Sequence, residues 1–413
     1  MQNSRRGFLR AAASWAAMAQ ALKAAPSSAA PRNEEYWSVV RRQFPLDENL
    51  IYLNTANVGS SSRAVLDRHQ EFLRDFQANP SFQNREKYEG LRSATRAKLG
   101  KFLGVQAQEI AFTRNTSEAS NIIVHGLDLK AGDEVLITNH NHQCNKEAWE
   151  IRARREGIVV KKLPITTPAA SRESLIAQFE AAITPRTRVI GLTHVTNTTG
   201  LMFPVLEIAK LARAKNIWLH LDGAQTFGLL DIHLKSLDVD SFAASTHKWL
   251  MGPLEAGILY VREERLKEVW PSIVTAGWSD NASGAAKLEN FGQRDDPRLT
   301  AIDAAIDFTN LIGVANIESR VRYLATRFKE KCRAIPGLKL RTNMQPELCG
   351  GIVKVSTGEE NGKRHYDALY RDHRIATSLT PTGDASGIRF SAHVYNSIHD
   401  IDRAADALQR VAG

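Results

Sequence analysis

The sequence predicts an α/β fold, in which a large domain holds a mostly parallel seven-stranded sheet and a smaller C-terminal domain is α+β. The chain has 413 residues, 43% of them hydrophobic and 24% charged, which is ordinary for a globular protein with a sizeable core. Short runs rich in β-branched residues alternate with helical patterns, and this alternation favours parallel strands covered by helices on both faces. After Asp295-Asp296-Pro297 the alternation gives way to long helical segments and two further strand-like runs.

Seven strand-like runs make up the predicted sheet. Two of them, 188–195 and 217–222, are nearly continuous apolar stretches, as is typical of parallel strands buried on both faces. The other five runs are 109–113, 134–138, 158–163, 241–246 and 257–261. Helical patterns lie between several strands, at 117–127, 145–156 and 206–216. In the C-terminal part we expect helices at 299–312 and 315–335, and strands in GIVKVST and GIRFSA.

The first thirty residues form a segment of their own. SRRGFLR (4–10) is followed by a 12-residue apolar run (11–22), which is shorter than the roughly 20 residues needed to span a bilayer. A small-residue tail follows the run, and the whole segment resembles a twin-arginine export signal. We therefore expect no transmembrane span, and export of the folded protein to the periplasm by the twin-arginine machinery. The alternative is a frayed basic amphipathic terminus.

The domain organisation follows from these patterns. We predict a signal peptide at 1–30, an N-terminal arm at 31–65, a large domain at 66–295 and a small C-terminal domain at 296–413. The net charge is +9, and four of those charges lie in residues 1–30, which hold no acid, so the rest carries +5. Its Lys and Arg residues are scattered among acids rather than clustered, which argues against a nucleic-acid partner.

The three cysteines, Cys144, Cys332 and Cys349, are too few for a disulfide framework. Because the number is odd, at least one of them is unpaired within the chain. A bridge between Cys332 and Cys349 stays open at this point.

Two neighbouring strand ends carry residues suited to chemistry. HLDGAQ puts Asp222 at the end of the strand 217–222, with Gln225 three residues later. STHK puts Ser245, His247 and Lys248 at the end of the strand 241–246. In a parallel sheet, ligands bind outside the carboxyl ends of the strands, so these side chains are candidates for one site.

Two further strand ends add an anion site and histidines. The strand 109–113 leads into RNTSEAS, where Thr116 and Ser117 open a helix, and such a turn offers N–H groups and hydroxyls to a phosphate. The strand 134–138 leads into NHNHQCN, which contains His140 and His142. A phosphate site, a carboxylate and a lysine at adjacent strand ends predict pyridoxal 5′-phosphate (PLP), which needs a Schiff-base lysine and a carboxylate at its pyridine nitrogen.

Each feature alone has a simpler explanation. A strand-end aspartate such as Asp222 is often a turn former, and NTSEAS is also a plain helix N-cap. The histidines could be structural, or ligands of a metal, because His-x-His is a common ligand spacing. We discount zinc, because no third cluster of ligands is apparent. The joint presence of the four features in this order supports the PLP site.

These residues resemble a known family. The stretches TRNTSEA, HVTNTTG, HLDGAQTFG, STHKWLMGP and RFSAHVYNSIHDID are similar, in the same order, to the class V aminotransferase group of fold-type I PLP-dependent transferases. That group includes the cysteine desulfurases, kynureninase and the isopenicillin N epimerase-like proteins. The resemblance covers the chain from YLNTANVGSSS (52–62) to the C-terminus.

The resemblance implies roles for particular residues. Lys248 would form the Schiff base, Asp222 would pair with the pyridine nitrogen, and His142, followed by Asn145 and Trp149, would stack on the ring. The other implied cofactor contacts are Gln225 at the ring hydroxyl, Asn197 near the ring oxygen, and Thr116, Ser117, Ser245 and His247 at the phosphate.

The family also implies a homodimer with its sites at the interface. Thr275 in TAGW would then reach the phosphate of the neighbouring subunit, unless the loop is only a surface loop. Arg389 would grip the α-carboxylate of the substrate with its bidentate fork, the alternative being a salt bridge in the small domain. We assign Asn57 to the substrate site as well.

Two departures limit what the resemblance implies about the reaction. Desulfurases carry a nucleophilic cysteine shortly before the carboxylate-binding arginine, but residues 373–391 contain none, and Cys349 is expected to be buried. Glu255 stands where many relatives have glycine, and we assign it no role.

We therefore expect a PLP enzyme that acts on an amino acid or a peptide-linked amino group by transamination or epimerase-type chemistry. The exported PLP enzymes that tailor siderophores combine the same kind of leader with the same motifs. The alternatives are a β-eliminating, desulfurase-like lyase acting on a cysteine derivative, and a non-catalytic relative that only binds a ligand.

Overall fold

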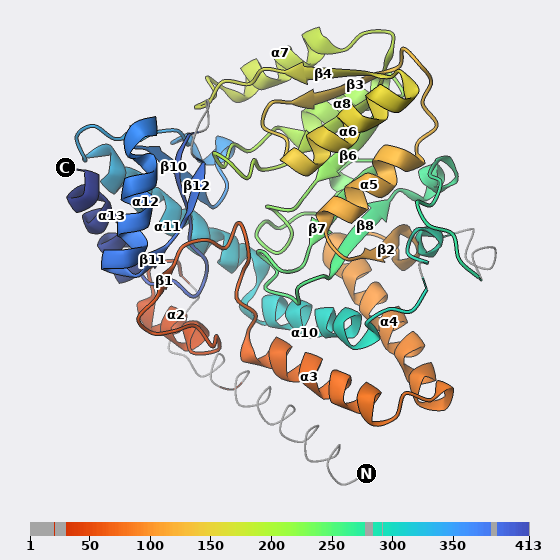
Figure 1. The fold of residues 1–413 in the computed structure, drawn as a ribbon, viewed down its shortest axis with the longest axis horizontal. Coiled ribbons are helices and arrows are strands. Elements are labelled where there is room, and N and C mark those ends of the chain that lie inside the picture. Colours follow the sequence, from red (N-terminus) through yellow and green to blue (C-terminus); the bar gives the residue numbers. More distant parts are fainter. Residues whose placement is uncertain (1–19, 21–29, 277–283, 291, 381–385, 413) are drawn as a thin grey trace.

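The computed structural model describes residue 20 and residues 30–276, 284–290, 292–380 and 386–412 (Figure 1). The predicted leader lies outside the described residues, apart from residues 20 and 30. Within the described part of the chain, no helix is both long and apolar enough to cross a membrane.

A seven-stranded sheet forms the centre of the larger part of the molecule, in the order β2-β8-β7-β6-β5-β3-β4. Six of the seven strands run in the same direction, and β8 alone runs antiparallel to its neighbours β2 and β7. The predicted α/β fold with a mostly parallel sheet is confirmed, and all seven strands lie where the sequence predicts them. Their bounds are β2 Ile110–Thr113, β3 Glu134–Thr138, β4 Val159–Leu163, β5 Thr187–Thr193, β6 Trp218–Asp222, β7 Ser241–Ser245 and β8 Gly257–Val261.

Helices cover both faces of this sheet because successive strand residues point to opposite sides. On one face, α5 (Thr116–Gly126) and α6 (Gln143–Glu156) pack on a core that includes Val135 and Ile137. On the other face, a core that includes Leu136 joins α4 (Phe82–Leu103), α7 (Arg172–Ala182) and α8 (Val205–Ala214). The short α9 (Leu234–Leu237) contacts α8.

The C-terminal part has its own sheet, in the order β12-β13-β10-β9 and wholly antiparallel. Val353, Val355, Ile388 and Phe390 point to one face, where three helices cover them (Figure 1). The bounds are β9 Lys339–Leu340, β10 Ile352–Ser356, β12 Ser378–Thr380, β13 Gly387–Ser391, α11 Val314–Arg333, α12 Glu359–His373 and α13 Ile398–Ala412.

The N-terminal arm ties the two parts together. It includes α2 (Glu34–Arg41), β1 (Ile51–Tyr52) and the start of α3 (Arg63–Ala78), and β1 pairs in parallel with β11 (Ile375–Ala376). The helix α10 (Asp296–Ile312) packs against α3 and α4 beside the large sheet, although the sequence assigns it to the small domain (Figure 1). The domain boundaries stay predictions.

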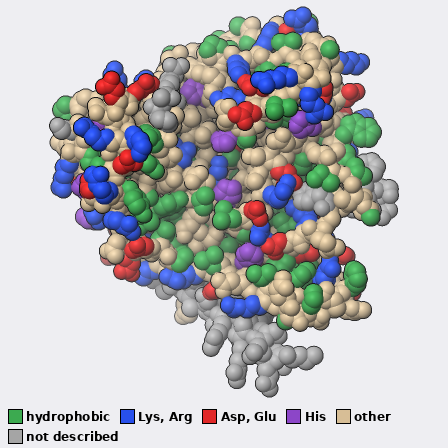
Figure 2. All heavy atoms as spheres, viewed as in Figure 1, with side chains coloured by type: hydrophobic (Ala, Val, Ile, Leu, Met, Phe, Trp, Pro, Cys, Tyr) green, Lys and Arg blue, Asp and Glu red, His purple; other side chains and the backbone are tan. Residues whose placement is uncertain are grey.

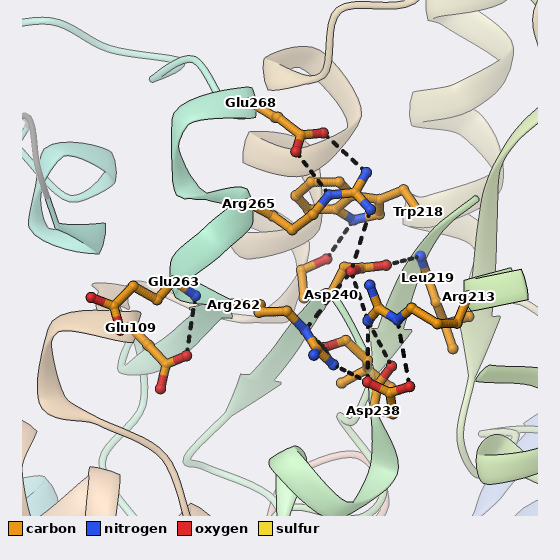
Figure 3. Close-up of polar contacts among 12 residues, drawn as sticks. Glu109, Arg213, Trp218, Leu219, Asp238, Asp240, Arg262, Glu263, Arg265 and Glu268 are labelled. Carbon is orange, nitrogen blue, oxygen red and sulfur yellow. Dashed lines mark hydrogen bonds and ion pairs between the residues drawn. The ribbon is translucent and has the colours of Figure 1, made fainter. Parts of the chain in front are cut away.

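A charged cluster closes the edge of the large sheet at which β6 and β7 begin (Figure 3). Asp240 is 1% exposed, accepts a hydrogen bond from the Leu219 N–H at 2.8 Å, and lies 3.2 Å from the Arg213 guanidinium. Arg265 lies 3.6 Å from the same carboxylate and stacks over the Trp218 ring at 4.7 Å. This edge is opposite to the one that carries Asp222, so the cluster stabilises the sheet away from the candidate site.

Replacing Asp240 by alanine is expected to lower the free energy of unfolding by about 3 kcal/mol, because it leaves a buried N–H and nearby guanidinium groups without their carboxylate. Urea unfolding followed by circular dichroism measures this loss. Asp372→Ala removes an exposed carboxylate that pairs with Arg371, and should leave the unfolding midpoint nearly unchanged. Equal midpoints for wild type and Asp240→Ala would contradict the assignment of a structural role.

Candidate active site

Nine of the residues that the sequence predicts for the site line a single cavity at the carboxyl edge of the large sheet. Figure 2 shows histidine side chains near the middle of this face, between the lobe of the C-terminal helices and the lobe of the large sheet. The predicted residues in the cavity wall are Thr116, Ser117, His142, Asn197, Asp222, Gln225, Ser245, His247 and Lys248, and Asn115, Cys144, Thr193 and Ala224 complete it.

Lys248 follows β7 and is held by the N-terminal arm. The Gly59 N–H donates to the His247 carbonyl at 2.6 Å, and a Cβ at Gly59 would lie 2.1 Å from the Lys248 carbonyl oxygen. Only glycine therefore allows the arm to approach this close. Burial lowers the pKa of the Lys248 amine, and the charge of Arg389 lowers it further, against the opposing charge of Asp222. A lowered pKa favours the neutral amine, which is the nucleophilic form.

Asp222 is held by two donors at the end of β6. Its Oδ2 accepts from the Asn145 side-chain amide at 2.8 Å, and its Oδ1 accepts from the Ala224 N–H at 2.9 Å. The carboxylate is 3% exposed. Burial lowers the pKa of both Lys248 and His142, and the charge of Asp222 opposes this lowering in each case. A fixed, buried carboxylate of this kind suits a positively charged ring nitrogen.

Gln225 is fixed by contacts with two different segments. Its Nε2 donates to the Ala56 carbonyl at 2.9 Å, and its Oε1 accepts from the Trp249 indole N–H at 2.8 Å. One N–H of the amide remains for a ligand, because the Nε2 carries two protons and one is used.

A hydroxyl cluster lies at the N-terminus of α5. The Thr116 N–H donates to the Ser245 Oγ at 2.8 Å, and the two hydroxyl oxygens are also 2.8 Å apart. Asn115 caps the helix by accepting from the Glu118 N–H. His247 beside this cluster has a pKa lowered to about 4 by burial and by Lys248, so its ring is neutral at neutral pH and can donate to an anion. N–H groups and hydroxyls at a helix N-terminus form a phosphate site.

His142 is the N-cap of α6 and contacts Cys144. Its Nδ1 accepts from the Cys144 N–H at 3.3 Å and lies 3.0 Å from the Cys144 Sγ. Burial lowers the pKa of this histidine, so the ring is neutral at neutral pH. We assign the proton of the neutral ring to Nε2, because Nδ1 is used as an acceptor.

Arg389 lies on β13 and reaches the large domain. It donates to the Asn197 carbonyl at 2.8 Å and to the Asn54 Oδ1 at 2.9 Å, and its buried Nε has no partner within the part of the chain that the structure describes. Burial lowers its pKa to about 10, which still leaves it charged at neutral pH. The structure thus connects Arg389 with the cavity wall through Asn197.

Two predicted residues lie away from this cavity. The Asn57 side chain is exposed, and it is Asn54, three residues earlier, that contacts Arg389. Thr275 donates to the Asn290 Oδ1 at 2.7 Å, outside the cavity wall. Both assignments stay predictions.

Two other residues that the sequence singles out, His140 and Glu255, have local partners. One ring nitrogen of His140 lies 3.0 Å from the Ile165 carbonyl, and Glu255 pairs with Arg298 at 2.5 Å. The described residues contain no cluster that could hold a metal ion.

Asn54, Cys144 and Thr193 belong to the site or contact it, although the sequence patterns do not predict them there. The Thr193 Oγ1 is buried without a partner in the described structure, and it lies at the carboxyl end of β5, which was the available signal. Asn54 lies in the YLNTANVGSSS stretch, where Asn57 is equally polar. Cys144 immediately precedes Asn145, and nothing in its sequence context distinguishes it from a core cysteine.

Cys144 is expected to be the first cysteine that iodoacetamide modifies in the folded protein. It is partly exposed, whereas Cys332 and Cys349 are 2% and 3% exposed and neither forms a disulfide. Burial raises the pKa of its thiol, so the reaction should be slow at pH 7 and faster as the pH rises. Peptide mass spectrometry measures the modification, and loading with cofactor should protect Cys144. Earlier modification of Cys332 or Cys349 would contradict this arrangement.

The cavity fits PLP on the chemistry of its donors. It combines a hydroxyl cluster for the phosphate, a fixed carboxylate, and a lysine whose amine makes no hydrogen bond within the described residues. The Thr193 Oγ1 and Asn197 Oδ1 are buried without a hydrogen-bond partner among the described residues, as expected where a polar ligand is to be bound.

Comparisons with known proteins agree with this geometry. An isopenicillin N epimerase from Amycolatopsis lactamdurans is 30% identical over 396 residues, covering 91% of this chain and 98% of that protein. A probable cysteine desulfurase from Methanothermobacter thermautotrophicus is 26% identical over 403 residues, with 91% and 98% covered. A solved structure of a C-DES mutant, with glycine covalently linked to the PLP cofactor, shares the fold with a TM-score of 0.81 at 24% identity, covering 90% and 98%. The model of the class V aminotransferases matches residues 51–404, so the chain belongs to that family, and the predicted cofactor, pyridoxal 5′-phosphate, is confirmed.

Proposed function

We propose that the chain is a PLP-dependent enzyme that removes the α-proton of an amino acid or of a peptide-linked amino group, followed by transamination or epimerisation. The observation that carries the proposal is the placement of Lys248 and Asp222 in the wall of one cavity, with Arg389 bonded to the carbonyl of Asn197 in the same wall. A non-catalytic binding protein would not require a buried lysine of lowered pKa beside a fixed carboxylate.

Some residues of the site bind the substrate and the cofactor, and others take part in proton transfer. Arg389 binds a carboxylate of the substrate, and the hydroxyls of Thr116 and Ser245 hold the phosphate of the cofactor. When bound, PLP withdraws electrons from the α-carbon of the substrate. The Asp222 carboxylate would pair with the ring nitrogen of the bound cofactor, and the Lys248 amine, whose pKa is lowered by burial, would take the α-proton.

The position at which the proton returns decides the product. In the order of the sheet, β6 and β5 lie between β7, which leads to Lys248, and β3, which leads to His142, so the two groups approach the cavity from opposite flanks. The proton on the His142 Nε2 therefore favours protonation on the side opposite to Lys248, which would give epimerisation. Return of the proton to the cofactor by Lys248 would give transamination.

The second candidate is β-elimination from a cysteine derivative, as in a desulfurase-like lyase. Cys144 favours it, because this thiol lines the cavity although residues 373–391 hold no cysteine. The relatives bear the names of epimerases and of desulfurases, so both candidates agree with the comparisons.

The experiment that tests the proposed function is incubation of the PLP-loaded protein with L-amino acids, cysteine derivatives and glutamyl peptides in D2O. Proton NMR follows exchange of the α-proton, and chromatography identifies the products. A keto acid supports transamination, a D-epimer supports epimerisation, and sulfide with pyruvate supports the lyase. No α-proton exchange with any substrate, in a protein that holds PLP, would contradict the proposed function.

We also propose a periplasmic location, reached by twin-arginine export, and a siderophore precursor as the substrate. The leader sequence supports this. Cell fractionation tests it, because the double variant Arg5→Lys with Arg6→Lys should keep the protein in the cytoplasm.

A homodimer is proposed on the family pattern. Leu254, Trp270 and Val274 are 60%, 64% and 65% exposed, and such apolar side chains favour an interface. Light scattering of wild type and Trp270→Glu tests it, with a monomeric wild type as the contradicting result.

A further inference from the structure

Two cations lie side by side on one face of the C-terminal sheet. Lys354 on β10 is the register partner of Arg389 on β13, so their side chains project from the same face of the antiparallel pair. Lys354 is wholly buried and Arg389 is 8% exposed. Ser378 and Thr380 of β12 share this face, opposite to the apolar face that the helices cover.

Neither cation has a carboxylate partner within the described part of the chain. The Lys354 ammonium donates to the Thr380 Oγ1 at 2.6 Å, and Arg389 donates to a backbone carbonyl and to Asn54. Arg320, which is equally buried, lies 2.6 Å from the Glu34 carboxylate. Buried charges are normally paired, because removing a lone charge from water is costly.

The pKa values of Lys354 and Arg389 are both lowered, as expected for buried cations that lack a carboxylate partner. Burial, and then the charge of Arg389, lower the pKa of Lys354 to about 7, and burial lowers that of Arg389 to about 10. Arg389 is the charged group that acts on the Lys354 amine within the described residues. The Thr380 hydroxyl on β12 accepts from this amine, and the Thr342 hydroxyl beside β9 accepts from the Lys354 backbone N–H. A negative charge placed here would be bound by both cations.

This face points toward the candidate active site. Arg389 contacts the backbone of Asn197, which lines the cofactor cavity, and Lys354 lies directly beside Arg389 on the next strand. The Thr380 hydroxyl accepts from Lys354, so its own proton is left for another acceptor. Thr380 is only half-buried, so a ligand can reach this hydroxyl.

We propose that Lys354, acting with the Thr380 hydroxyl, binds a second carboxylate of the substrate while Arg389 binds the first. The substrate class is then an acidic amino acid, or an acidic residue of a peptide, rather than a neutral amino acid. This inference rests on the proposed function, because it takes Arg389 to be the site of a substrate carboxylate.

The test is calorimetric binding of glutarate and butyrate to the PLP-loaded protein. These acids have no amino group, so their binding does not depend on catalysis. Wild type should bind glutarate at least about tenfold more tightly than butyrate. A ratio of this size in the dissociation constants is expected from one additional contact between a carboxylate and a cation. Lys354→Met and Thr380→Val should each lose this preference and keep the affinity for butyrate. Thr380→Val keeps the shape of a half-buried side chain, so it gives a result even where Lys354→Met does not fold.

A second measurement, the uptake of a proton when glutarate binds, distinguishes a contact with the Lys354 charge from a change in the shape of the site. At pH 8 the Lys354 amine of the free protein is largely neutral, and a bound carboxylate raises its pKa, so glutarate binding should take up a proton. Titrations in two buffers of different ionisation enthalpy measure this uptake, which Lys354→Met should abolish. Lys287→Met is the control, because this lysine is also buried but donates to the Leu266 carbonyl.

Equal affinity of wild type for glutarate and butyrate would overturn the inference, as would an unchanged preference in both variants. These results are distinct from a failure of the proposed function, which would appear as absence of α-proton exchange in the loaded wild type.

Discussion

Lys248→Ala is expected to lower kcat/KM by at least about 10³-fold, because the variant loses both the covalent anchor of the cofactor and the base for the α-proton. The structure supports both roles: the amine is buried, its pKa is lowered, and the Gly59 contact holds its backbone. Steady-state kinetics on the substrate found in the screen measure the activity. The visible absorbance of the bound cofactor should change as well, because the bond to Lys248 is absent.

The control for this prediction is Lys210→Ala, which removes an exposed lysine of α8. It should retain full activity and the absorbance of wild type. Lys248→Ala protein that folds, binds PLP and keeps more than a tenth of the wild-type activity would contradict the role of Lys248.

Asp222→Ala is expected to lower kcat by about 10³-fold and to weaken cofactor binding, because nothing then keeps the ring nitrogen protonated. The Asn145 amide would also lose its acceptor, so the N-terminus of α6 would be less well positioned. Kinetics give kcat, and equilibrium dialysis of the cofactor gives its dissociation constant.

Asn145→Ala distinguishes the charge of the Asp222 carboxylate from the hydrogen bond that positions it. It leaves the carboxylate and removes only one hydrogen bond to it, so kcat should fall by about tenfold. A loss as large as that in Asp222→Ala would indicate that the position of the carboxylate matters more than its presence. Asp222→Ala with wild-type kcat would contradict the pairing with the ring nitrogen.

The sequence predicts those parts of the site that depend on local patterns. Apolar runs mark the strands, and a polar residue directly after a run lies at the carboxyl edge, so Asp222 and Lys248 are predicted from position alone. The Thr116 cluster follows in the same way from the turn that opens α5. These local signals explain the positions of the seven strands and of eight residues of the cavity wall, whereas Asn197 was expected from the family resemblance alone.

Contacts between distant segments could not be predicted in this way. The pairing of Lys354 with Arg389 depends on the register of β10 and β13. A shift of one residue in either strand would move its cation to the opposite face of the sheet. The choice of Asn54 over Asn57 depends on where the arm crosses β13, and there Asn54 forms an isolated bridge with Ser391. The packing of α10 on α3 and α4 is likewise a tertiary feature, because the apolar residues along a helix do not by themselves determine which elements will cover them.

The measurement that tests the central claim most directly is identification of the lysine that carries the cofactor. The protein is loaded with PLP, reduced with borohydride and digested, and mass spectrometry locates the pyridoxyl group. We predict the modification on Lys248, in the peptide that contains THKWL. Modification of another lysine, or no modification in protein that binds PLP, would contradict the assignment of the active site.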